Sequence, residues 1–489
     1  MDLFYKYITQ QEELQKIIPE LMVRQSWGVD TETTGLDPLV DTVILLQIGN
    51  RDIQFVIDVR KVDIEPLREF LESHTHIKIM HNGKFDYKMI KENHGIEVEN
   101  IKDTFLGEKC LCSGKKRSGF GLGAVLLSRT GIEMDKEAQK SFINHVGEFT
   151  QKQLEYAALD VAYLDGVAKN QEDEMKAVGL LNTWKVENYA IQCFGDMELN
   201  GLKLDVKKWE ENIKSNQLEA EKLAQQMGEY SVPYVGEDLF GSANINYDSP
   251  AQMLSLMKDM GVTVPVWDKG REVEIEIPDT SDKTLKKIRD GYPIVDMLKK
   301  YRGFQVRVNT FGHSFIEAIH PATGRIHPQL NQYGTETGRP AKASDSPINP
   351  LNIPRDKVFR NAFIADPDWV IETDDYSACE LRIWAEVSED PALLEAFQKG
   401  IDVHCMVASR MYGVEVTKHN ENKALRTPAK SLNFGRRKQL CRSKTYSIQG
   451  NLSRVESGMA ILSESVRNNG SVQRLTAQTE RLWTGYATA

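Results

Sequence analysis

Two consecutive strand-like segments near the N-terminus place the strongest constraint on the fold. In WGVDTET (residues 27–33) apolar and polar residues alternate, and VILLQIG (residues 43–49) is a short β-rich run. Side chains two residues apart in a strand point to the same face, so Asp30 and Glu32 present two carboxylates to one side. The segment therefore predicts a strand, a turn and a second strand, with paired acidic groups on the first.

Two further segments carry acidic residues in a defined local context. IKIM (residues 77–80) is strand-like, and the HNG that follows it opens a helix that carries Asp86. TQKQLEYAALDVAYLDGVA (residues 150–168) predicts an amphipathic helix that begins after a threonine cap. Tyr156 and Asp160 are four residues apart, so they lie on one face of this helix.

Four converging carboxylates favour a specific chemistry. They would repel one another and raise one another's pKa unless cations lay between them. Carboxylate oxygens suit Mg²⁺ or Mn²⁺, and two such ions can activate a water and stabilise a leaving oxyanion at a phosphodiester. The alternative for each motif alone is a solvated charge on a strand edge or a helix surface. Three motifs in this order favour a catalytic site in which Tyr156 holds the water.

The motifs DTET, NGKFD and YAALD resemble the three motifs of a DEDDy-type 3′→5′ exonuclease. The segment DKEAQKSF (residues 135–142) is similar to the one that precedes the third motif, with Phe142 where relatives often carry Trp, a change expected to affect packing only. The resemblance implies an α/β fold of the RNase H-like type, with two Mg²⁺ (or Mn²⁺) ions in the active site. It implies the ligands Asp30, Glu32, Asp86 and Asp160, and Tyr156 as the water-orienting residue.

The middle of the chain predicts a helical region. MELNGLKLDVKKWEENIK continues into a long amphipathic stretch after a turn, and a second helix is entered through Ser249 and Pro250. A third cation-rich segment ends in YRGFQVRVNTFG, at residues 301–312. From composition alone, the alternative is an exposed helical bundle without nucleic-acid contacts.

Two later segments suggest nucleotide chemistry. VIET (residues 370–373) predicts a strand with Asp375 at its end, followed by a helix from Ser377. An Asp at a strand end can bind metal, although capping a helix is the commoner role of such a residue in isolation. In RTPAKSLNFG (residues 426–435) two cations and an aromatic ring are spaced four residues apart, which lines one helical face for a polyphosphate and a base.

Taken together, these segments resemble the family A DNA polymerases, the DNA polymerase I-like enzymes. DDYSACELR is similar to their motif A, RTPAKSLNFG to the start of motif B, TGR and NIP to segments before motif A, and MELNG and YRGFQVRVNTFG to the thumb. The resemblance implies that Asp375 binds a metal ion and that Glu380 is a steric gate against the ribose 2′-OH. It implies that Arg426 and Lys430 contact the triphosphate and that Phe434 contacts the incoming sugar and base. It also implies that Arg339 contacts the primer–template.

The resemblance stops after Gly435. Motif B should continue to a Tyr-Gly pair, where Lys438 and Gln439 stand. The remaining 54 residues hold nine Lys and Arg but only three acids, a net charge of +6 that leaves −16 for the preceding 435 residues. Those acids are Glu456, Glu464 and Glu480, and none lies in an apolar strand–turn–strand like the His-Asp-Glu motif of relatives. We therefore expect a polymerase truncated within motif B and impaired in synthesis, in a compact layout similar to that of phage enzymes.

The sequence thus predicts four regions. They are an exonuclease domain at 1–186, a helical thumb-like region at 187–310, a partial palm and fingers at 311–435, and a disordered tail at 436–489. The expected partners are single-stranded and primer–template DNA, with deoxynucleotides if the polymerase site functions, and a cytoplasmic monomer without a membrane segment is expected in a bacterial or phage-infected cell. Two alternatives are an active DNA polymerase completed by another chain and a non-catalytic DNA-binding remnant.

Overall fold

The computed structural model describes residues 3–112, 119–134, 140–239, 241–268, 271–288, 291–335 and 337–430. The chain divides into two compact units. The first holds residues up to 196, residues 332–340 and the described residues from 372 on, and the second holds residues 197–331 and 341–371. The domain boundaries expected at residues 186, 310 and 435 stay predictions, and the expected tail at 436–489 lies outside the described residues.

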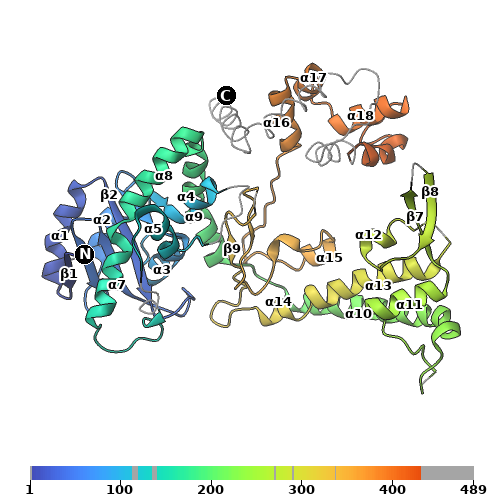
Figure 1. Cartoon of the computed structure of the whole chain (residues 1–489), viewed down its shortest axis with the longest axis horizontal. Coiled ribbons are helices and arrows are strands. Elements are labelled where there is room, and N and C mark those ends of the chain that lie inside the picture. The colour runs from blue at the N-terminus through green and yellow to red at the C-terminus, as the bar shows by residue number, and fades with distance from the viewer. Residues whose placement is uncertain are drawn as a thin grey trace. The chain divides into compact units, whose positions relative to one another are not determined.

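A six-stranded mixed sheet organises the N-terminal part of the first unit (Figure 1). Its strand order is β1-β4-β3-β2-β5-β6, in which β2, β3 and β4 run antiparallel and the other neighbours run parallel. The predicted strands at WGVDTET, VILLQIG and IKIM are confirmed as β2, β3 and β5. The strands are β1 (Tyr5–Ile8), β2 (Ser26–Thr33), β3 (Val43–Gly49), β4 (Gln54–Asp58), β5 (Ile77–Met80) and β6 (Ile101–Asp103).

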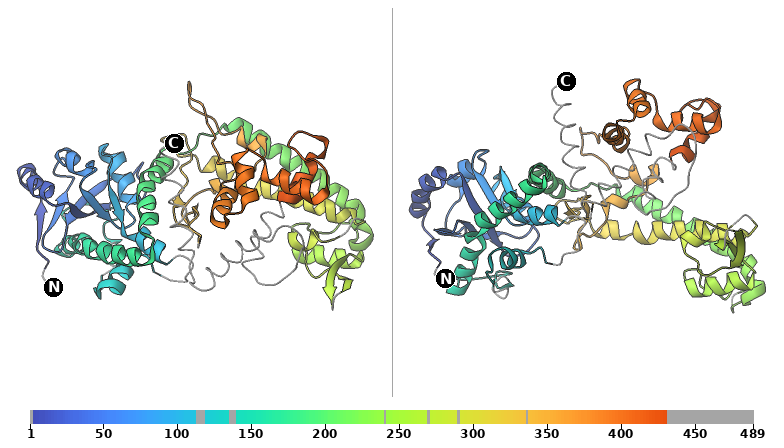
Figure 2. Two further views of the ribbon diagram at one scale, coloured as in Figure 1. Left: turned by 90° about the horizontal axis from the view of Figure 1, so that it is seen from above. Right: turned by 45° about the horizontal axis from the view of Figure 1, so that its top comes forward.

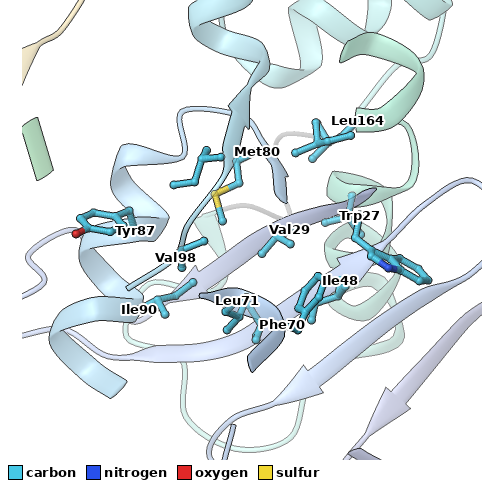
Figure 3. Close-up of a cluster of buried hydrophobic side chains, with 14 of the residues drawn as sticks. Trp27, Val29, Ile48, Phe70, Leu71, Met80, Tyr87, Ile90, Val98 and Leu164 are labelled. Carbon is cyan, nitrogen blue, oxygen red and sulfur yellow. The ribbon is translucent and has the colours of Figure 1, made fainter. Parts of the chain in front are cut away.

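Helices cover this sheet (Figure 2), and buried side chains between them form a continuous apolar core. Trp27 and Val29 of β2 lie in the core with Met80, Tyr87 and Ile90, which come from β5 and the helix after it (Figure 3). The helices are α1 (Gln11–Val23), η1 (Glu65–Leu67), α2 (Arg68–Leu71), α3 (Lys84–His94), α4 (Thr104–Leu111), α5 (Leu122–Thr130), α7 (Gln151–Ala162), α8 (Leu164–Val178) and α9 (Leu181–Asn200).

Helix α7 approaches the sheet unusually closely at two glycines. A Cβ atom added to Gly28 would lie 2.6 Å from the carbonyl oxygen of Val161, and one added to Gly49 would lie 2.8 Å from a methyl group of the same residue. Only residues without a side chain allow this approach. The two glycines therefore fix how near α7 comes to β2 and β3.

Replacing Gly28 with alanine is expected to destabilise this part of the unit. The new methyl group meets a backbone carbonyl, which cannot rotate away, so α7 must shift, and overpacking of this kind costs about 1–3 kcal/mol. Hydrogen exchange of peptides from β2 and α7 measures the effect as a loss of protection. Gly166→Ala is the matched control, because a Cβ at this helical glycine of α8 meets no atom within 4 Å and should not lower protection.

The second unit is mainly helical, as predicted. The long helix α10 (Val206–Val235) lies beside α13 (Pro293–Thr310) (Figure 2). The helix expected at Pro250 is confirmed, with Ser249 as its N-cap. No helix within the described ranges is long and apolar enough to cross a membrane. The other elements are α11 (Pro250–Asp259), β7 (Thr263–Asp268), β8 (Arg271–Glu276), α12 (Asp282–Leu285), α14 (Ser314–Glu317), β9 (Leu330–Asn331), β10 (Ala341–Lys342), η2 (Pro350–Asn352) and α15 (Lys357–Arg360).

The strand predicted at residues 370–373 is wrong. These residues lie outside every helix and strand. Val370, the first of them, is 86% exposed, and Trp369 just before it is 77% exposed. A strand needs a neighbour to receive its backbone hydrogen bonds, and none of the described segments pairs with this one. The predicted helix after it is confirmed as α16 (Cys379–Ser388), followed by α17 (Pro391–Gln398), α18 (Val403–Tyr412) and η3 (Glu421–Leu425).

Candidate active site

Strand β2 contributes the first two carboxylates of the candidate site. Asp30 and Glu32 lie on the face of the strand that Gly28 also occupies, the face against which α7 packs. The pairing of β2 with β3 shifts register between Glu32 and Thr33, as in a β-bulge. The local fold thus brings both carboxylates under the helix that carries the third motif.

Asp86 stands in the first turn of α3 and is tied to the same strand. Its Oδ1 atom accepts a hydrogen bond from the backbone N–H of Thr31 at 3.0 Å and one from the Thr31 hydroxyl at 2.6 Å. Burial raises the pKa of Asp86 to about 7, while the hydrogen bonds from Thr31 act to lower it. Thr31 lies between the two acidic residues of DTET, and the sequence interpretation missed its role.

Helix α7 supplies the remaining pair. Thr150 and Gln153 form a capping box at its start, which confirms the predicted threonine cap. Tyr156 and Asp160 lie on one face as the spacing predicted, and the Tyr156 hydroxyl donates a hydrogen bond to the Asp160 carboxyl. Burial and the neighbouring carboxyls raise the pKa of Tyr156, so the phenol keeps its proton at neutral pH.

Three of the carboxylates come together closely. One oxygen from each of Asp30, Glu32 and Asp160 lies within 4.8 Å of the others. Burial raises the pKa of Asp30 well above its usual value, and the charges of Asp86 and Asp160 raise it further. An all-oxygen set of half-buried and buried carboxyls that destabilise one another's charge is chemically suited to a hard divalent cation, which would remove the repulsion.

Of the residues expected at a polymerase site, the structure brings Arg339 and Glu380 together but does not place Asp375 in a group of possible metal ligands among the residues it describes. A guanidinium nitrogen of Arg339 lies 3.0 Å from a carboxylate oxygen of Glu380, so these two are brought together. Asp375 is exposed and lies outside every helix and strand. Within the ranges that the structure describes, Asp30, Glu32 and Asp160 form the one group of three possible ligands at metal-binding spacing, and Asp375 is not in it.

The expected triphosphate contacts stand at the start of a helix. The helix begins at Arg426, which puts Pro428 in its first turn, where proline is tolerated. The Arg426 guanidinium is ion-paired with Asp402 at 2.8 Å, and the Lys418 ammonium lies 3.2 Å from the same carboxylate. Asp402 was not identified from the sequence, and only its position before a helix start could have drawn attention to it. Lys430 is exposed. The predicted contact Phe434 lies outside the described residues.

Comparison with protein families gives two matches that cover most of the chain. Residues 5–176 match the family model of a 3′-5′ exonuclease, and residues 213–437 match that of DNA polymerase family A. The first range contains the three acidic motifs, and the second ends two residues after Gly435.

Individual relatives agree with the family matches. DNA polymerase I of Aquifex aeolicus (strain VF5) is 30% identical over 456 residues, which cover 88% of this chain and 71% of that protein. DNA polymerase I of Chloroflexus aurantiacus is 28% identical over 450 residues, 86% of this chain and 45% of that protein, so this chain spans less than half of it. Among solved structures, the POL domain of Pol1 from M. smegmatis, in complex with DNA primer-template and dNTP, has a TM-score of 0.69 at 19% identity, over 96% of this chain and 77% of that one.

Proposed function

The chain belongs to the family A DNA polymerases and carries the 3′-5′ exonuclease domain of that family, and from this premise we propose that it removes nucleotides from DNA 3′ ends during replication. The observation that carries the proposal is the convergence of Asp30, Glu32 and Asp160 within 4.8 Å. Asp86 and Tyr156 complete the DEDDy set. The substrate is single-stranded DNA or a frayed primer end.

Each residue has a distinct part in the proposed hydrolysis. Asp30, Glu32, Asp86 and Asp160 would hold two Mg²⁺ or Mn²⁺ ions, which when bound supply an activated water and stabilise the leaving 3′ oxyanion. Tyr156 keeps its proton and orients the attacking water through its hydroxyl, while Asp160 accepts from that hydroxyl and fixes the ring. Thr31 orients the Asp86 carboxylate.

A directional digestion assay tests this function. Single-stranded DNA labelled at its 5′ end, incubated with the purified chain and Mg²⁺, should give a ladder that shortens one nucleotide at a time. A phosphorothioate at the last linkage should delay the ladder, and EDTA should abolish it. Loss of the 5′ label first, or undiminished digestion in EDTA, would exclude a metal-dependent 3′→5′ nuclease.

A second activity, templated DNA synthesis, has weaker support, and we propose that it is impaired in this chain. The family A match to residues 213–437 and the Arg339–Glu380 pair support polymerase ancestry. Against activity, Asp375 lies outside any strand, and the acids after Gly435 are limited to Glu456, Glu464 and Glu480. A phage-like polymerase that departs from the family within motif B would have the ancestry and lack the activity. Completion by another chain and a non-catalytic DNA-binding remnant stay as alternatives.

Binding to primer–template DNA should weaken steeply with salt. The helical unit carries exposed cations, among them Lys207, Lys214 and Lys300, and each phosphate contact releases counterions. For about 6–10 contacts the affinity should fall roughly 10³- to 10⁵-fold between 50 and 200 mM salt. Fluorescence anisotropy of a labelled primer–template over a salt series measures the slope.

The basic segment after Gly435 could produce the same slope, so the experiment needs a matched variant. Replacing all nine Lys and Arg residues after Gly435 with Gln removes every cation of that segment without changing the described residues. If the number of phosphate contacts calculated from the salt slope changes by no more than about one in this variant, the contacts belong to the helical unit. A slope that collapses in this variant, or an affinity that does not respond to salt, would contradict the prediction.

A further inference from the structure

Thr31 donates two hydrogen bonds to the same carboxylate oxygen of Asp86. Both donors, the backbone N–H at 3.0 Å and the side-chain hydroxyl at 2.6 Å, converge on one oxygen, Oδ1. Thr31 is 6% exposed and Asp86 is 3% exposed, so water does not readily replace either donor. A carboxylate oxygen has two lone-pair sites, and here Thr31 fills both.

The topology of the sheet explains why Thr31 can do this. The parallel pairing of β2 with β5 extends only as far as Gly28 opposite Ile79, so the described part of the sheet leaves the next residues of β2 without a strand neighbour on that edge. The Thr31 N–H would otherwise be a buried donor without an acceptor. The Asp86 carboxylate takes the place of the missing strand, and the hydroxyl of Thr31 adds a second donor to the same atom.

We propose that Thr31 is a positioning residue that reserves Oδ1 of Asp86 for hydrogen bonding and so leaves Oδ2 as the single oxygen with which Asp86 binds a divalent cation. The inference rests on the proposed nuclease function. It predicts that the Thr31 hydroxyl governs cation affinity through Asp86, although it lies outside the set of metal-binding carboxylates. An orienting partner of this kind typically contributes about 10- to 100-fold to metal affinity or activity.

The competing explanation is that Thr31 only fills space in a buried strand. Two substitutions separate the explanations because they remove different groups. Thr31→Val keeps the branched shape and removes the hydroxyl, whereas Thr31→Ser keeps the hydroxyl and removes a methyl group. A positioning role makes valine the more harmful substitution for cation binding, and a space-filling role makes serine the more harmful one for stability with no difference in cation binding.

The experiment measures Mn²⁺ binding directly, by titrating the full-length chain and following free Mn²⁺ by electron paramagnetic resonance. Thr31→Val should weaken Mn²⁺ binding about 10- to 100-fold, and Thr31→Ser should stay within about threefold of the wild type. Single-turnover digestion should show the same order, with a higher Mn²⁺ requirement for Thr31→Val and an unchanged KM for DNA at saturating Mn²⁺. Thr33→Val is the matched control, since its hydroxyl donates to the Gly35 carbonyl at 2.6 Å and touches no carboxylate.

The outcomes distinguish failure of the inference from failure of the proposed function. Thr31→Val that binds Mn²⁺ as tightly as the wild type, in a chain that digests DNA, overturns the role of Thr31 alone. Equal losses in Thr31→Val and Thr33→Val indicate a general packing defect and also overturn it. A wild-type chain that neither binds Mn²⁺ nor digests DNA overturns the nuclease proposal on which the inference rests.

Discussion

The chain carrying Asp30→Ala is expected to lose nearly all of its 3′→5′ digestion of single-stranded DNA. Asp30 belongs to the close group of carboxylates, and burial and the charges of Asp86 and Asp160 raise its pKa. Its removal takes a carboxylate from the proposed cation-binding set itself, so the loss should exceed the roughly 10- to 100-fold that a merely orienting group contributes. Initial rates with 5′-labelled DNA at saturating Mg²⁺ measure this effect.

The size of the loss should depend on what each residue does. Asp160→Ala should be as severe as Asp30→Ala, because Asp160 belongs to the same close group of carboxylates. Tyr156→Phe removes only the hydroxyl that we propose orients the water, so its rate should fall less than in either aspartate variant. This order separates cation binding from water positioning.

A folding defect would also abolish activity, so the test needs a control that keeps the fold. Asp30→Asn preserves the side-chain shape and removes a buried negative charge, which should leave the metal-free protein at least as stable as the wild type. Its melting temperature in EDTA should therefore not fall while its activity does. Wild-type rates in Asp30→Ala would show that this cluster is not the nuclease site.

The geometry of the acidic cluster could be predicted because local patterns determine each part of it. Alternation in WGVDTET specified which face of β2 carries Asp30 and Glu32, and the i, i+4 spacing specified the pairing of Tyr156 with Asp160. In the structure these elements bring Asp30, Glu32 and Asp160 close together. Their roles as ligands stay predictions from the resemblance.

The contacts that the sequence did not predict are tertiary. No local pattern indicates that Thr31 donates two hydrogen bonds to a carboxylate 55 residues away, or that Arg426 pairs with Asp402. The close approach of α7 at Gly28 likewise depends on two segments that meet only in the fold. The strand predicted at VIET failed for a related reason, because β-branched residues give a segment the propensity for a strand but do not supply the neighbour it must pair with.

The second large effect concerns synthesis: the 489-residue chain is expected not to extend a primer. Nucleotidyl transfer needs one cation to activate the primer 3′-OH and another to neutralise the triphosphate. A single carboxylate does not hold such a pair, and Asp375 has no group of partner ligands within the ranges that the structure describes. After Gly435 the sequence offers three scattered glutamates and neither Asp nor His.

The nucleotide side of the site supports the same expectation. Arg426, the expected triphosphate contact, already pairs with Asp402, which Lys418 also approaches. A triphosphate would have to displace an ion pair in which the Arg426 side chain is only 29% exposed. The segment before Asp375 is exposed and belongs to no strand, so fixing it in a sheet around the substrate would cost conformational entropy. Substrate binding would therefore have to overcome both costs before chemistry began.

A primer-extension assay tests for DNA synthesis, and it needs a variant in which digestion does not remove the extended products. The assay uses the Asp30→Ala chain, a labelled primer–template, four deoxynucleotides and Mg²⁺, and it compares this chain with one that also carries Asp375→Ala. We expect the two to be indistinguishable, because Asp375 alone does not assemble a two-cation site. Templated products well above those of the Asp375→Ala chain would refute the prediction. They would instead require that these 489 residues contain a second carboxylate able to act with Asp375, and the three glutamates after Gly435 would then be the residues to substitute next.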